Sequence, residues 1–81
     1  MHRIKSKQVY TTCRGGATSA YPETVIVVDD YQPGCRTVQV YDERQPARQF
    51  DIPVSYFHET VMTERGTRRK TGYYLTSRSA L

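Results

Sequence analysis

The stretch "ETVIVVDDYQPGCRTVQVYD", residues 23–42, decides the fold of this chain. It begins with a dense run of β-branched residues, 23–30, which is typical of a strand buried on much of both faces. Pro33 and Gly34 suit the two central positions of a type II turn, because proline presets φ and glycine accepts a positive φ. Residues 36–42 then alternate, with Val38 and Val40 on one face. Strand, turn and strand predict a β-hairpin.

The composition of the whole chain agrees with a sheet. Among its 81 residues Thr occurs ten times and Val eight times, whereas Leu occurs twice. β-branched and aromatic residues fit a pleated surface, and the best apolar helix formers are nearly absent. The length predicts one small domain over residues 1–81 with a thin core.

The segment after the hairpin predicts an edge strand and a short helical turn. In "FDIPV", residues 50–54, the apolar side chains alternate. Because Pro53 cannot donate to a ladder, this strand lies at a sheet edge or ends at Pro53. Such an edge could pair with a second copy of the chain. The next stretch, 55–62, fits a helix or a strand. In the helical alternative Ser55 is the N-cap. We favour one helical turn near residues 54–58 that leads into a strand; the competing α+β fold has a helix over 55–64.

Two further strands complete the expected sheet. "KQVYTTC", residues 7–13, predicts the first strand, and "KTGYYLTS", residues 70–77, predicts the last one, after a turn around Gly66. The prediction is an all-β or β-rich chain, a five-stranded meander that closes into a small barrel and so removes its open edges. The basic N-terminal arm, residues 1–7, and the C-terminal tail, residues 77–81, are candidates for disorder.

The proline-glycine tip of the hairpin and the following "IPVSYF", residues 52–57, resemble SH3-like barrels, in which a turn of helix precedes the last strand. This resemblance implies a fold and leaves the function open.

The charge distribution concentrates the functional question on the ends of the chain. The net charge is +4 at pH 7. Residues 1–20 carry basic side chains and no acid, residues 21–63 are acidic, and residues 64–81 are basic again. This segregation predicts opposite potentials on different parts of the surface.

The leading functional hypothesis is non-enzymatic binding of DNA or RNA. The stretch "ERGTRRKTGYY", residues 64–74, places cations around a glycine turn and beside two tyrosines, and cations contact phosphates while aromatic rings stack on bases. Tyr73 and Tyr74 face opposite ways on a strand, so one of them belongs to the core. The candidate contact residues in the 65–70 turn, the last strand and the arm are Arg65, Arg68, Arg69, Lys70, Tyr73, Arg3, Lys5 and Lys7.

The alternative hypothesis is a protein-interaction module, an inhibitor or adaptor that docks on a larger protein. Tyrosine is enriched at interface hot spots, and the acidic middle of the chain holds several tyrosines. The candidate interface residues are Tyr31, Tyr41, Asp30 and Asp42.

The sequence offers no constellation for catalysis, a cofactor or a metal. Cys13 or Cys35 with His58 is a nucleophile pair of low specificity, and the scattered Cys and His residues lack the paired spacing of zinc ligands. We therefore expect two free thiols, no metal, no cofactor and no enzymatic activity. No apolar run is long enough for a membrane span and the N-terminus lacks a secretory signal, so the expected location is the cytoplasm.

Overall fold

The structure is a computed structural model that describes residues 3–18 and 20–78. It consists of strands and one short 3-10 helix. The elements are β1 (Val9–Thr12), β2 (Thr24–Val27), β3 (Thr37–Asp42), β4 (Gln49–Pro53), η1 (Val54–Tyr56), β5 (Phe57–His58) and β6 (Tyr73–Ser77).

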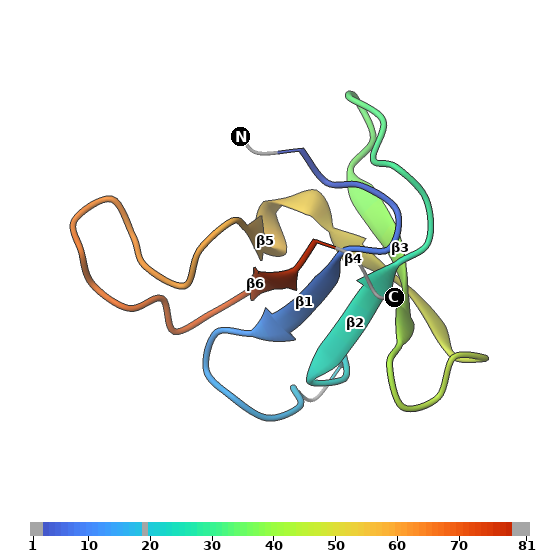
Figure 1. Ribbon diagram of the computed structural model, residues 1–81, viewed down its shortest axis with the longest axis horizontal. Helices are drawn as coiled ribbons and strands as arrows, with labels where there is room; N and C mark the ends of the chain where they lie inside the picture. The colour runs from blue at the N-terminus through green and yellow to red at the C-terminus, as the bar shows by residue number, and fades with distance from the viewer. Residues whose placement is uncertain (1–2, 19, 79–81) are drawn as a thin grey trace.

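The strands form one curled sheet in the order β4-β3-β2-β1-β6-β5, a half-barrel (Figure 1). The all-β prediction is confirmed, and β1 to β4 follow one another as a meander. The predicted number of five strands is wrong. The sixth strand is β5, which pairs in parallel with β6 through Phe57 and Tyr73. A strand was expected after the helical turn, but two residues are too few for a period-two pattern, so neither its length nor its parallel partner could be predicted from the sequence.

The central hairpin is confirmed. In the antiparallel pair of β2 and β3, Val27 lies opposite Val40. The turn at its tip has a hydrogen bond of 3.1 Å from the N–H of Cys35 to the carbonyl of Gln32, and Gly34 has a φ of +98°. This positive φ explains why glycine stands there. The whole connection, residues 28–36, is longer than this turn.

The helical turn predicted near residues 54–58 is confirmed as η1, and it leads directly into β5. Ser55, the N-cap of the helical alternative, lies inside η1; Pro53 occupies the N-cap position and no side chain caps the turn. The longer helix over 55–64 does not form. After η1, the extended backbone of Phe57 ends the helical turn.

The core fills the concave side of the sheet. Its buried members are Ile4, Tyr10, Val25, Val27, Val38, Val40, Ile52, Phe57 and Tyr73. Tyr10 and Phe57 meet edge to face with ring centroids 4.9 Å apart, the geometry that aromatic pairs prefer. Burial of each large apolar side chain stabilises the fold by roughly 1.5–3 kcal/mol. Ile52 and Phe57 lie on either side of η1 in the sequence. Because both are buried in the core, they fix the two edge strands that η1 connects.

The described part of the N-terminal arm lies against the sheet. Ile4 is 3% exposed and belongs to the core, and its carbonyl accepts a hydrogen bond of 2.9 Å from the N–H of Tyr31. The N–H of Lys7 donates to the carbonyl of Val27, and the N–H of Ser6 donates to Asp30 Oδ1. Residues 3–7 are therefore anchored, while residues 1–2 lie outside the described residues.

The predicted tail, residues 77–81, begins at the last residue of β6. Arg78 forms a salt bridge of 3.3 Å with Glu59, and residues 79–81 lie outside the described residues. At the other end of the sheet, β4 occupies an edge, as Pro53 predicted. Within residues 3–18 and 20–78, no helix has the length and apolar character needed to cross a membrane.

Candidate nucleic-acid interface

Between β5 and β6 the chain makes a long excursion, residues 59–72, that projects from the sheet (Figure 1, orange). Its end is a tight turn. The N–H of Thr63 donates to the carbonyl of Thr67 over 2.8 Å, and Gly66 has a φ of +84°. Met62 and Arg68 form an isolated antiparallel bridge behind this turn. The turn predicted around Gly66 is therefore the tip of a two-stranded ribbon.

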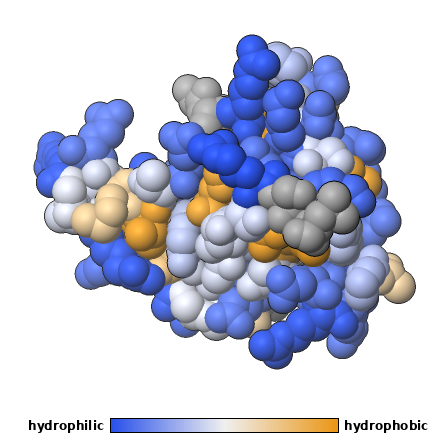
Figure 2. All heavy atoms as spheres, in the orientation of Figure 1, coloured by the Kyte–Doolittle hydropathy of each residue, from blue (hydrophilic) through white to orange (hydrophobic). Residues whose placement is uncertain are grey.

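The cations of this excursion are mostly exposed. Arg65, Arg68 and Lys70 are exposed, whereas Arg69 is half-buried. In the described parts of the chain none of these four forms a salt bridge; the ion pair found there joins Arg78 to Glu59. Figure 2 shows the outer part of the excursion, at the left, as mainly hydrophilic. Unpaired cations on a projecting ribbon create a positive potential that is available to an anionic partner.

The loop after β1 contributes a cation that the sequence reasoning did not select. The N–H of Cys13 donates to the carbonyl of Gly72 over 2.9 Å, and the Arg68 guanidinium donates to the carbonyl of Cys13 over 3.2 Å. These bonds hold the start of the loop beside the excursion. Arg14 consequently lines the same cavity as Lys70. The one sequence signal for Arg14 as a contact residue is its position in residues 1–20, which contain no acidic residue.

We define the cationic surface as the basic residues that these contacts bring to the excursion and the adjoining loop. Its members are Arg14, Arg65, Arg68, Arg69 and Lys70.

Tyr73 does not belong to this surface. It is 1% exposed, its ring stacks on Phe57 with centroids 5.9 Å apart, and its hydroxyl donates to the carbonyl of Pro22. Burial raises the pKa of Tyr73 well above its usual value. A ring packed in this way cannot stack on a base, so the assignment of Tyr73 as a contact residue is corrected. Tyr74, the next residue, is half-buried on the opposite face.

The basic arm lies elsewhere. Arg3 and Lys5 are exposed and line a cavity of about 610 Å³ together with Tyr31 and Pro33 of the 28–36 connection. Lys7 is exposed and has a φ of +73°. The two basic ends of the sequence therefore pack against different parts of the fold, the arm beside the hairpin tip and the excursion beside the loop after β1.

The four residues of the predicted protein interface do not share one face. Tyr31 is half-buried and its hydroxyl donates to the carbonyl of Cys35, while Asp30 accepts the N–H of Ser6. Tyr41 and Asp42 are successive residues of β3 and point to opposite faces. Asp42 is 7% exposed. Both aspartates thus have local structural roles.

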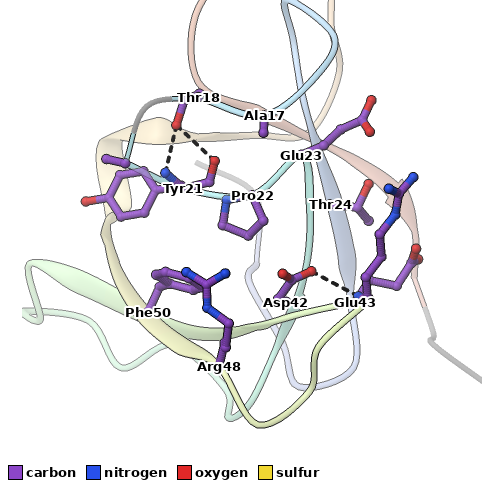
Figure 3. A pocket seen from close by; sticks show the side chains of 12 residues that line it. Ala17, Thr18, Tyr21, Pro22, Glu23, Thr24, Asp42, Glu43, Arg48 and Phe50 are labelled. Carbon is purple, nitrogen blue, oxygen red and sulfur yellow. Dashed lines mark hydrogen bonds between the residues drawn. The ribbon is translucent and has the colours of Figure 1, made fainter.

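Acidic side chains gather around a cavity of about 440 Å³ between the loop before β2 and the β3–β4 connection (Figure 3). Glu23, Asp42 and Glu43 line it. Asp42 Oδ1 accepts the N–H of Arg44 over 2.9 Å, and the Arg48 guanidinium lies over the Phe50 ring, 5.4 Å from its centroid. Arg44 and Arg48 line the cavity as well, so it carries charges of both signs, unlike the cationic surface.

The two thiols differ in their exposure to solvent. Cys13 and Cys35 are both free; Cys13 is buried and Cys35 is exposed. Burial raises the pKa of the Cys13 thiol, although the charges of Arg69 and Arg68 act to lower it. The thiolate, which is the nucleophilic form, is therefore disfavoured at Cys13. In the described portion of the chain, no three His, Cys, Asp or Glu side chains are grouped as metal ligands.

No protein-family model matches this sequence, and no curated protein and no solved structure is significantly similar to it.

Proposed function

We propose that this protein is a non-enzymatic nucleic-acid-binding protein that contacts the phosphate backbone of DNA or RNA through the cationic surface. The observation that supports this most strongly is the projecting excursion, whose exposed Arg65, Arg68 and Lys70 form no salt bridge with the described residues. Cations without acidic partners keep their full attraction for phosphates and release condensed counterions when they bind.

The fold gives these cations a rigid base. We propose that the sheet completes an SH3-like barrel, because η1 connects its two edge strands, β4 and β5. The excursion is anchored to this body at both ends, through the β5–β6 pair and the Cys13–Gly72 hydrogen bond. The long side chains can therefore fan out around the Gly66 turn towards a backbone while the body stays fixed.

The proposed role is regulatory or accessory, in the cytoplasm, where thiols such as those of Cys13 and Cys35 stay reduced. The arm, with Arg3, Lys5 and Lys7, would provide a second and separate patch for phosphates on a longer ligand.

The test is a titration with single-stranded and duplex DNA and RNA at several salt concentrations, followed by fluorescence anisotropy. Four or five phosphate contacts predict a log–log slope of affinity against salt of roughly −3 to −5. The triple replacement Arg65→Ala, Arg68→Ala, Lys70→Ala removes the exposed cations and leaves the half-buried Arg69 in place, so it should reduce the slope. Because Arg68→Ala also removes the hydrogen bond to the Cys13 carbonyl, a thermal melt of the variant checks that the fold is kept. Absence of binding at low salt would contradict the proposal. It would favour a larger protein as the partner, with the cavity lined by Glu23, Asp42 and Glu43 as the candidate contact site.

A further inference from the structure

A groove of about 540 Å³ lies directly beside the cationic surface. Three segments build it: the loop after β1, the 3-10 helix η1, and the end of the excursion. The lining residues that carry the argument are Arg14, Tyr21, Tyr56, Lys70 and Gly72. Nothing in the proposed phosphate binding uses its aromatic side chains.

The walls of this groove meet at Gly72. A Cβ on this residue would lie 2.6 Å from the carbonyl oxygen of Tyr56, so only glycine allows the excursion to approach η1 this closely. Gly72 also has a φ of +81°, which favours glycine. The carbonyl of Gly72 accepts a hydrogen bond from the N–H of Cys13, which belongs to the loop after β1, the third segment of the groove. The groove is therefore fixed by backbone contacts.

The aromatic side chains of the groove offer a stacking surface. Tyr56 is 42% exposed, in contrast to the buried rings of the core. Tyr21 meets Tyr56 edge to face with centroids 6.2 Å apart, and it meets Phe50 in the same way at 6.1 Å. These edge contacts position Tyr21 and leave the exposed part of Tyr56 available. A ring held in this way can stack on a flat partner at little entropic cost.

The charges at the groove favour an anionic ligand. Arg14 and Lys70 line it, and no Asp or Glu is found among the described residues of its lining. The neighbouring cavity of Figure 3, which shares Tyr21, is lined instead by Glu23, Asp42 and Glu43. Arg44 and Arg48 also line that cavity, so its charges are mixed, whereas the Arg and Lys side chains of the groove have no acidic neighbour among the described lining residues.

We infer that this groove takes an unpaired base of a single-stranded nucleic acid, which stacks on Tyr56 while the flanking phosphates contact Lys70 and Arg14. The inference rests on the proposed function and names its ligand class. A base inside a duplex has no free face to offer, whereas every unpaired base has one. The protein should therefore prefer single strands to duplexes of the same sequence.

The experiment uses a single-stranded oligonucleotide that carries one 2-aminopurine, whose fluorescence falls when it stacks. Anisotropy of the same complexes gives the affinity. The variant is Tyr56→Ala, and its matched control is Tyr56→Phe, which keeps the ring and removes the hydroxyl. We expect Tyr56→Ala to weaken single-strand binding about 5- to 150-fold, the range for loss of one base–aromatic stack. It should abolish the fluorescence change and leave the salt slope unaltered. Tyr56→Phe should behave like the unaltered protein.

The outcomes separate this inference from the proposed function. Salt-dependent binding that Tyr56→Ala does not weaken, or tighter binding of duplex than of single strands, would overturn the groove assignment and leave the cationic surface intact. Absence of binding by the unaltered protein at low salt would overturn both. Tyr56 is exposed, and a thermal melt of Tyr56→Ala that matches the unaltered protein excludes unfolding as the cause of lost binding.

Discussion

The backbone N–H of Cys13 donates a hydrogen bond of 2.9 Å to the carbonyl of Gly72. These two residues are far apart in the sequence, and their bond joins the loop after β1 to the end of the excursion. It brings Arg14 and Lys70 to one groove and completes the cationic surface. The proposed function depends on this hydrogen bond between Cys13 and Gly72.

Replacement of Gly72 by Ala should destabilise the fold more than replacement of Gly66. Both glycines have a positive φ, of +81° and +84°, so each variant incurs roughly 1–2 kcal/mol for the left-handed conformation. A Cβ at Gly72 also meets the Tyr56 carbonyl at 2.6 Å, whereas one at Gly66 meets nothing within 4 Å. We expect this clash to add about 1–3 kcal/mol. Urea unfolding of Gly72→Ala and Gly66→Ala measures the difference, and equal losses would show that the close approach does not exist.

Replacement of Tyr73 by Phe should reduce stability and leave nucleic-acid binding unchanged. The variant loses the hydrogen bond from the hydroxyl to the Pro22 carbonyl, at a cost of about 1–2 kcal/mol. Tyr74→Phe, at the half-buried neighbouring position, is the matched control and should cost little. Denaturation and anisotropy give the two readouts. Weaker nucleic-acid binding by a stable Tyr73→Phe variant would show that Tyr73 contacts the nucleic acid.

The stability of the protein should fall at alkaline pH. Burial raises the pKa values of Tyr10 and Tyr73 far above 10, so both stay protonated in the folded state while the unfolded chain releases these protons near pH 10. Their contribution to stability is fully present below pH 10 and is lost as the pH rises further, by about 1.4 kcal/mol per pH unit for each tyrosine. Unfolding in denaturant from pH 9 to about pH 11.5 measures the slope. Tyr73→Phe should show a shallower slope, and identical slopes would refute the assignment.

The arm should contribute to folding as well as to charge. Because Ile4 is 3% exposed in the core, Ile4→Ala should cost about 2–5 kcal/mol. Lys5→Ala, at the exposed neighbouring position, should be nearly neutral. Thermal unfolding of the two variants provides the comparison. Equal melting temperatures for Ile4→Ala and the unaltered protein would mean that the arm does not dock.

The sequence predicted the parts of the fold that local patterns determine. The central hairpin, the turn at Gly34 and the edge position of Pro53 each follow from the conformational limits of particular residues. A strand after the helical turn was expected, but the parallel pairing of β5 with β6 could not be predicted, because this pair is made by residues on either side of the excursion and leaves no local pattern. Ile4 was missed for a related reason, since a single apolar residue among cations shows no periodicity.

The candidate site was predictable in composition and not in arrangement. The cations of residues 65–70 were evident as a cluster, and the alternation rule required one of Tyr73 and Tyr74 to be buried. Which of the two is buried depends on the register of β6 against β1, where Tyr73 lies opposite the buried Thr12. Arg14 joins the surface through hydrogen bonds between segments distant in sequence, which a one-dimensional pattern does not contain.

The measurement that tests the central claim most directly compares two charge-matched triple variants. One variant replaces Arg65, Arg68 and Lys70 with alanine; the other replaces Arg3, Lys5 and Lys7, which are also exposed cations but lie outside the cationic surface. Both lower the net charge by three, so a difference between them reports position and not total charge. The log–log salt slope for a short single-stranded oligonucleotide is measured for each. We predict that the excursion variant loses roughly 0.7 units of slope for each phosphate contact removed, about two units in all, and that the arm variant keeps most of the slope. Equal slopes, or a larger loss in the arm variant, would contradict the account.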